Sequence, residues 1–209
     1  IVQLTILMKY IQPQKIYQSF LLPGISVISL GVVLWVQIWL LGAPLERDEG
    51  EYADMAQQLL QGVLSYTESL SIKFPGGFFM YAGVLSFFGE SHGAIHLSLL
   101  FLNLATAFLL FLLDKNLLDF SAGIIAAICF SVLTLSTSLH GIWPNLENFV
   151  LLPAMGEIYY FEWLKTTNLH DFFSGLLLGY SLLIKQHAIF FCLFGAIYLA
   201  SRYFSTSQP

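Results

Sequence analysis

Charged residues are scarce in this chain of 209 residues, since Asp, Glu, Lys and Arg together make up only 10% of it. In soluble domains about a quarter of all residues are charged. The eight Lys and Arg residues and the net charge of −5 leave no basic surface, so we expect no nucleic-acid partner. With 57% apolar residues, the sequence instead indicates an integral membrane protein in contact with membrane lipids.

Cysteine is also scarce, because the chain contains only Cys129 and Cys192, and both lie in apolar runs. A disulfide framework needs more cysteines at characteristic spacings, and zinc sites need clustered Cys or His ligands. No His-x-x-Glu or Cys-rich spacing is found in the sequence. We therefore expect no disulfide framework, no metal site and no cofactor.

Long apolar runs divide the chain into segments. As a helix, residues 20–42 are long enough to cross about 30 Å of hydrocarbon, and they are too long for the apolar core of a signal peptide. Further apolar runs occupy 74–88, 92–113, 120–139, 148–164, 172–184 and 188–203. The pattern predicts an all-α fold, a polytopic bundle of transmembrane helices.

The short run 74–88 decides the topology. As a helix it would reach only about 22 Å, less than the thickness of the hydrocarbon layer. If it does not cross, the cytoplasmic side holds more cations than the outside, as the positive-inside rule favours. The cytoplasmic cations are then Lys9, Lys15, Lys115, Lys165 and Arg202, and the outer ones are Arg47, Lys73 and Lys185. We therefore expect 43–91 to be an exoplasmic loop with juxtamembrane helices, and 92–203 to supply further transmembrane helices.

This topology gathers the polar residues of three loops on one membrane surface, because 140–147 and 185–187 then lie on the same side as 43–91. The gathered residues are Asp48, Glu49, Glu51, Lys73, His140, Asn145, Glu147, Lys185 and His187. A small transporter or assembly subunit would instead place its polar residues at mid-helix. That class is kept as an alternative.

The acidic stretch RDEGEYADMAQQLL, residues 47–60, predicts an amphipathic helix lying flat on the membrane. Tyr52, Met55 and Ala56 follow helical spacing on one face. Asp48 is the expected N-cap, and Glu51, three residues later, completes a capping-box-like pair. Capping alone explains these two acids, so a catalytic role needs further support.

Several segments together resemble a known family. They are residues 48–53 (DEGEYA), 73–81 (KFPGGFFMY), 88–89 (FG), 140–141 (HG), 144–148 (PNLEN) and 183–186 (LIKQ). They resemble the dolichyl-phosphate-mannose protein mannosyltransferase-like and aminoarabinose-transferase-like glycosyltransferases, which are GT-C membrane enzymes. The resemblance runs from about Ala43 to Tyr198, and its specific part is the acidic loop with its Lys-x-Pro. The usual Lys-Pro-Pro of the family reads Lys73-Phe74-Pro75 here.

The resemblance implies a GT-C type bundle in the bacterial plasma membrane, with its active site facing the exoplasm. It implies transfer of a sugar from a polyprenyl-phosphate donor to an exoplasmic acceptor. A lipid phosphate leaves readily, so the site needs a base for the acceptor hydroxyl and cations for the phosphate. Since family members are longer, we also expect the chain to be the N-terminal portion of such an enzyme, or an inactive fragment of one.

The candidate residues follow from these roles. The resemblance assigns the catalytic aspartate to Asp48, with Glu49 orienting it and Glu51 as the alternative acid. Lys73 and Lys185, and more weakly Arg47, are expected to converge on the phosphate. Snorkelling toward the headgroups is the simpler explanation for Lys73. Contacts to the acceptor or sugar are expected from Glu147, Asn145 and Tyr52.

Overall fold

The computed structural model describes residues 21–66, 71–163 and 168–206, and within them the regular structure is all helical. The helices are α3 (Leu22–Trp39), α4 (Arg47–Leu60), α5 (Pro75–Phe88), α6 (His92–Leu117), α7 (Phe120–Leu133), α8 (Leu146–Trp163), α9 (Asn168–Ile184) and α10 (Ile189–Thr206), with short 3₁₀ turns η2 (Leu40–Gly42) and η3 (Gln186–Ala188). The prediction of an all-α fold is confirmed for this part of the chain. Each predicted apolar run overlaps one of these helices, although α7 ends at Leu133, before the end of the run 120–139.

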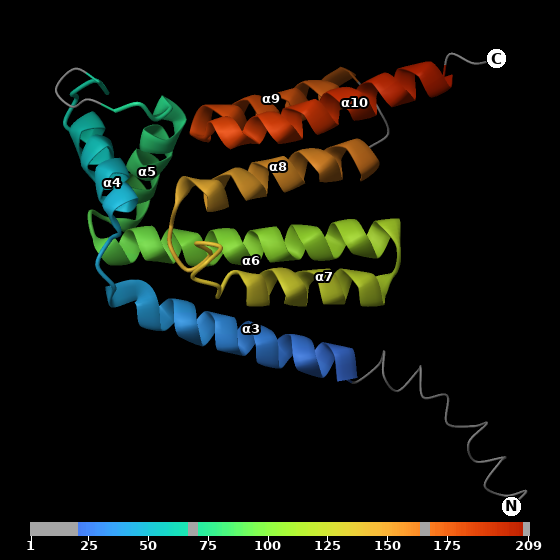
Figure 1. Ribbon diagram of the computed structural model, residues 1–209, viewed down its shortest axis with the longest axis horizontal. Helices are drawn as coiled ribbons and strands as arrows, with labels where there is room; N and C mark the ends of the chain where they lie inside the picture. The colour runs from blue at the N-terminus through green and yellow to red at the C-terminus, as the bar shows by residue number, and fades with distance from the viewer. Residues whose placement is uncertain (1–20, 67–70, 164–167, 207–209) are drawn as a thin grey trace, which may run out of the picture.

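The helices form a stack with one crossed end. In Figure 1, α3, α7, α6, α8, α9 and α10 run alongside one another, whereas α4 and α5 stand across one end of the stack. The α3–α4 link, the α7–α8 loop and η3 all lie at that end. Three segments far apart in the sequence therefore meet under α4 and α5.

Two helical segments, Leu22–Gly42 and His92–Leu117, are long and apolar enough to cross a membrane. Helix α5 lies transverse to the stacked helices (Figure 1), and the topology in which 74–88 does not cross a membrane stays a prediction. Lys115 lies in the last turn of α6, at the end of the stack away from α4. Lys9, Lys15 and Lys165 lie outside the described residues, as does the side chain of Arg202.

A buried core at the crossed end fixes α4 and α5 to the stack. Tyr52 from α4 packs edge-on against Tyr81 from α5, with ring centroids 5.5 Å apart. The Tyr81 hydroxyl donates a hydrogen bond to the Pro144 carbonyl in the α7–α8 loop. Leu146 from α8 and Ile184 from α9 complete this core. The transverse helices are thus held by aromatic packing and not only by their connecting loops.

Glycine permits the closest contact in this core. A Cβ atom at Gly76, in the first turn of α5, would collide with the Leu183 backbone carbonyl at the end of α9. Lys73 precedes α5 and Lys185 follows α9, so this contact also brings the two lysines toward each other. The Gly-Gly pair after Lys73-Phe74-Pro75 therefore permits the close packing of α5 that positions Lys73 near the end of α9.

Candidate functional site

The N-terminus of α4 is capped differently from the prediction. Glu46 is the N-cap, and a capping box joins it to Glu49, whose carboxylate accepts a hydrogen bond from the Glu46 N–H at 2.9 Å. The prediction that Asp48 caps the helix with Glu51 is wrong, because the helix starts earlier than expected. Asn145 donates to the Glu46 carboxylate at 3.2 Å, a tertiary contact that no local pattern contains. Asp48 and Glu51 are therefore not needed as caps.

Glu49 is buried, with one carboxylate oxygen bonded to the Glu46 N–H and the other without a partner among the described residues. Burial raises the pKa of Glu49 to about 7, although the Glu46 N–H opposes the rise. In the structure Glu49 therefore acts as the second residue of the capping box of α4, next to Asp48 in sequence. Its predicted catalytic role stays a prediction.

Lys73 is the centre of the candidate site. Its ammonium lies 3.2 Å from Asp48 and 2.9 Å from Glu51, and 4.2 Å from the centroid of the Tyr52 ring. Ser71 donates to the other oxygen of Glu51 at 2.7 Å. Lys73 therefore does not snorkel, because its ammonium points to α4 and not away from the protein.

Charge pairing decides the protonation states around Lys73. Burial alone would lower the pKa of Lys73, but its contacts with Glu51, Tyr52 and Asp48 outweigh burial and raise it. Burial also tends to raise the pKa of Glu51, but hydrogen bonds from Ser71 and Lys73 outweigh this and lower it. Lys73 is a firm cation and Glu51 a firm anion at neutral pH.

Lys185 follows α9 and forms an ion pair with Glu147 in the first turn of α8. It is the second cation of the site. Lys185 lines the same cavity as Lys73, and that cavity also contains Asp48 and Tyr52. The two ammonium groups pair with different carboxylates, so their convergence on one phosphate stays a prediction. The cavity has a volume of about 160 Å³, and its remaining lining residues are Ile72, Phe74, Leu146, Ile184 and Gln186. We call it the lysine cavity.

A second cavity of about 260 Å³ adjoins the first. It is lined by Glu46, Arg47, Asp48, His140, Asn145 and Glu147. Asp48 lines both cavities, and the Lys185–Glu147 ion pair has one member in each. We call it the polar cavity.

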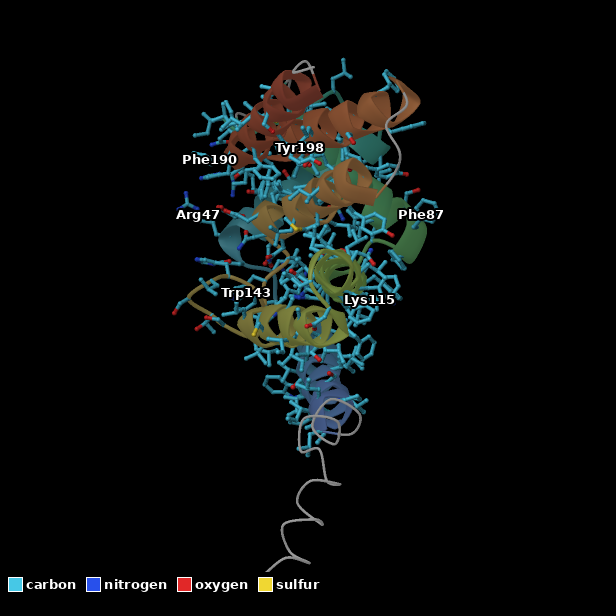
Figure 2. The ribbon with its side chains drawn as sticks, turned by 90° about the vertical axis from the view of Figure 1, so that its right-hand side faces the viewer. Arg47, Phe87, Lys115, Trp143, Phe190 and Tyr198 are labelled. Carbon is cyan, nitrogen blue, oxygen red and sulfur yellow. The ribbon has the colours of Figure 1, made fainter. Side chains whose placement is uncertain are left out.

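Arg47 is separated from the two lysines. It is exposed and lines the polar cavity, and Figure 2 shows it projecting outward on the flank that also carries Trp143. The structure therefore does not place Arg47 with the expected phosphate ligands. Glu147 and Asn145 line the polar cavity, whereas Tyr52 lines the lysine cavity.

Several residues of the site have no clear signal in the sequence. Ser71 fixes Glu51, and the Tyr66 hydroxyl donates to the Lys73 carbonyl at 2.5 Å. Glu157 is buried midway along α8, with no partner for either carboxylate oxygen among the described residues. An acid inside the apolar run 148–164, well away from its ends, is a sequence signal for Glu157, since charges there are costly.

Comparisons with known proteins add no assignment. No family model matches the sequence, and neither the curated proteins nor the solved structures provide a match. The function must therefore be inferred from the geometry of the two cavities and from the chemistry of their residues.

Proposed function

We propose that the protein is a membrane glycosyltransferase of the GT-C type, which moves a sugar from a polyprenyl-phosphate donor to an exoplasmic acceptor. The observation that carries the proposal is the lysine cavity, where Asp48 from α4 lies with Lys73 and Lys185. A carboxylate beside two ammonium groups matches a reaction that removes a proton and releases a phosphate.

The position of the lysine cavity suits a lipid-linked donor. In this proposal the stacked helices lie in the plasma membrane, with α3 and α6 long enough to cross it, and α4 and α5 lie on its exoplasmic surface (Figure 1). Ile72 and Phe74 line the cavity and are exposed, Ile72 fully. Exposed apolar side chains beside partly buried cations can accept a lipid chain while the lysines contact the phosphate.

The ion pairs of Lys73 link the binding of the donor phosphate to the release of Asp48 as a base. Without donor, Lys73 is shared between Asp48 and Glu51. A donor phosphate competes with Asp48 for the Lys73 ammonium, so donor binding frees the Asp48 carboxylate. Glu51, fixed by Ser71, keeps Lys73 in place during this exchange. Asp48 is then released as a base only when donor is bound.

The transfer step balances without a further reactant. Asp48 takes the proton of the acceptor hydroxyl while the acceptor oxygen bonds to the anomeric carbon of the sugar. The bond between that carbon and the phosphate oxygen breaks, and its electron pair leaves with the polyprenyl phosphate. Lys73 and Lys185 stabilise the negative charge that the departing phosphate gains.

A transporter is the second candidate, and Glu157 is the observation that favours it. A buried, unpaired acid within an apolar helix is typical of ion and substrate pathways. Asp48 and the two lysines, however, lie at the crossed end of the stack and not midway along it. The transferase explains more of the polar residues than the transporter does.

The test is a transfer assay with the full chain in liposomes. Polyprenyl-phosphate sugars are supplied with a membrane extract as acceptor, and release of free polyprenyl phosphate is measured. Asp48→Asn should lower turnover by about 10² or more, the loss expected for a general base. Asp119→Asn, at the opposite end of the stack, is the matched control and should leave turnover unchanged.

The Glu51→Gln variant distinguishes the roles of Asp48 and Glu51, the two acids next to Lys73. It should lower donor affinity more than turnover, because Glu51 positions Lys73 and does not take the proton. Normal turnover in Asp48→Asn together with loss of turnover in Glu51→Gln would transfer the catalytic role to Glu51. Turnover that depends on neither acid would rule out the proposed reaction at this site.

A further inference from the structure

The polar cavity lies against Asp48 on the side that Glu46, Arg47 and Asn145 surround, while the lysines share the other cavity. We propose that the polar cavity binds the acceptor, and that the acceptor presents an uncharged saccharide whose hydroxyl reacts. The inference rests on the proposed function, since it treats Asp48 as the group that connects donor and acceptor. A base that lines both cavities can reach a hydroxyl in one and a sugar in the other.

The hydrogen-bonding groups of the polar cavity suit a polyol. Arg47 supplies only donors, Asn145 carries both donors and an acceptor, and His140 offers one of each when neutral. The carboxylates of Glu46 and Glu147 supply acceptors. Each saccharide hydroxyl donates one hydrogen bond and accepts others, so a wall that mixes donors with acceptors can satisfy several hydroxyls at once.

The charges of the polar cavity disfavour an anionic acceptor. Three carboxylates line it, and Arg47 is the single Lys or Arg among the lining residues. A phosphate group on the acceptor would be repelled by Glu46, Asp48 and Glu147 at close range. An acceptor that carries its own phosphate next to the reacting hydroxyl therefore does not fit this cavity.

A cationic acceptor is disfavoured for a different reason, because the carboxylates already have partners. Asp48 lies 3.2 Å from Lys73, and Glu147 is paired with Lys185. Glu46 accepts from Asn145 and caps α4. An ammonium would have to displace these partners, whereas a neutral hydroxyl can use the remaining lone pairs. The uncharged saccharide is the class that the cavity accommodates without rearrangement.

The loop that forms the far wall is held in one conformation. Asn148 donates to the carbonyls of His140 at 3.0 Å and Trp143 at 2.8 Å. His140 has φ of 52°, a left-handed conformation that is uncommon outside glycine. A fixed wall lowers the cost of ordering a ligand. Figure 2 shows Trp143 and Arg47 on the same flank, away from Phe87, and the exposed Arg47 lines the polar cavity on that flank.

Saturation-transfer NMR on the full chain in lipid nanodiscs tests the inference. The probes are methyl glucoside, its 6-phosphate and its 2-amino analogue. Methyl glucoside should bind, and it should bind more strongly than either charged analogue. His140→Gly removes the imidazole and relieves the left-handed backbone, so it weakens binding without threatening the fold. Arg47→Gln removes an exposed donor, and each variant should weaken binding about three- to tenfold.

Asp54→Asn is the matched control, because Asp54 is exposed on α4 and lines neither the lysine cavity nor the polar cavity. It should leave glycoside binding unchanged. Stronger binding of the phosphate or amino analogue would overturn the inference, as would glycoside binding that neither His140→Gly nor Arg47→Gln alters.

Binding of sugar-free polyprenyl phosphate to the same samples separates the two proposals. If polyprenyl phosphate binds normally and methyl glucoside does not bind, the acceptor inference fails alone. If the glycoside binds as expected and polyprenyl phosphate does not bind, the proposed donor fails, while the saccharide site in the polar cavity is supported.

Discussion

The two ends of the helix stack use their charged residues differently. At the end away from α4, Asp119 caps α7 by accepting from the Ala122 N–H at 2.9 Å, and Lys115 lies 5.8 Å from the ring of Phe111 in its own helix. At the crossed end, Lys73 contacts carboxylates of α4, and Lys185 contacts the start of α8. Charges with local partners complete helix ends, whereas charges paired between distant segments mark the site.

The largest effect is expected from Gly→Ala substitutions, because each end of the stack contains a glycine at a tight contact. A Cβ atom at Gly76 would collide with the Leu183 carbonyl, and one at Gly123 with the Phe111 carbonyl. Either Gly→Ala change should lower the free energy of unfolding by about 1–3 kcal/mol, the usual cost of overpacking. Only Gly76→Ala should also weaken polyprenyl-phosphate binding, since it forces α5 away from α9 and separates the lysines.

Thermal unfolding in detergent and a lipid-phosphate binding assay would measure the two effects. Gly83→Ala in α5 is a further control, because nothing lies within 4 Å of a Cβ atom there. It should be neutral or slightly stabilising. Equal loss of lipid-phosphate affinity in Gly76→Ala and Gly123→Ala would contradict the account of the crossed end.

The buried cap of α4 predicts a pH dependence. The pKa of Glu49 is about 7 in the folded protein, against an ordinary value of 4.5, so the folded state binds the proton more tightly than the unfolded state. Stability should therefore fall as pH rises from about 4.5 to about 7, because the unfolded state then binds fewer protons. The total loss is on the order of a few kcal/mol at most.

Glu49→Gln tests this directly, since Gln preserves the capping box and cannot ionise. The thermal unfolding temperature of the wild type should decrease as pH rises from about 4.5 to about 7, and that of Glu49→Gln should decrease less. Parallel pH profiles for the two proteins would show that Glu49 is not responsible.

Arg47 provides the smallest predicted effect, and it distinguishes the two cavities within the crossed end. Arg47 lines the polar cavity and not the lysine cavity. Arg47→Gln should change the free energy of polyprenyl-phosphate binding by less than about 0.5 kcal/mol, as expected for an exposed side chain outside the contact. A tenfold loss of affinity would mean that Arg47 reaches the phosphate and that the cavities are not separate.

Much of the fold could be predicted because apolar run length and the balance of Lys and Arg are properties of the chain itself. A helix occupies each expected run. The short length of 74–88 predicted that it does not cross a membrane, which stays a prediction, whereas the position of α5 across the stack depends on tertiary packing. Lys73 and Lys185 line one cavity because the segments before α5 and after α9 lie at the same end of the stack, but their convergence on a phosphate stays a prediction.

The details of the site depended on tertiary contacts that sequence spacing does not contain. The cap of α4 is Glu46, selected with the help of Asn145 from a distant loop, so the local pattern favoured Asp48 wrongly. Arg47 and Asp48 are neighbours in sequence, yet only Asp48 lines the lysine cavity, because neighbouring side chains on a helix point in different directions.

The most direct test of the account is the affinity for sugar-free polyprenyl phosphate, which requires no knowledge of the sugar or the acceptor. It should be measured in nanodiscs for the wild type and for Lys73→Met, Lys185→Met and Lys115→Met. Each of the first two should weaken binding by about tenfold to a hundredfold, as expected for losing a charged hydrogen bond, while Lys115→Met should stay within about twofold of the wild type. Affinity that is unchanged in Lys73→Met and Lys185→Met, or reduced equally in Lys115→Met, would contradict the central claim that the two lysines of the crossed end form a lipid-phosphate site.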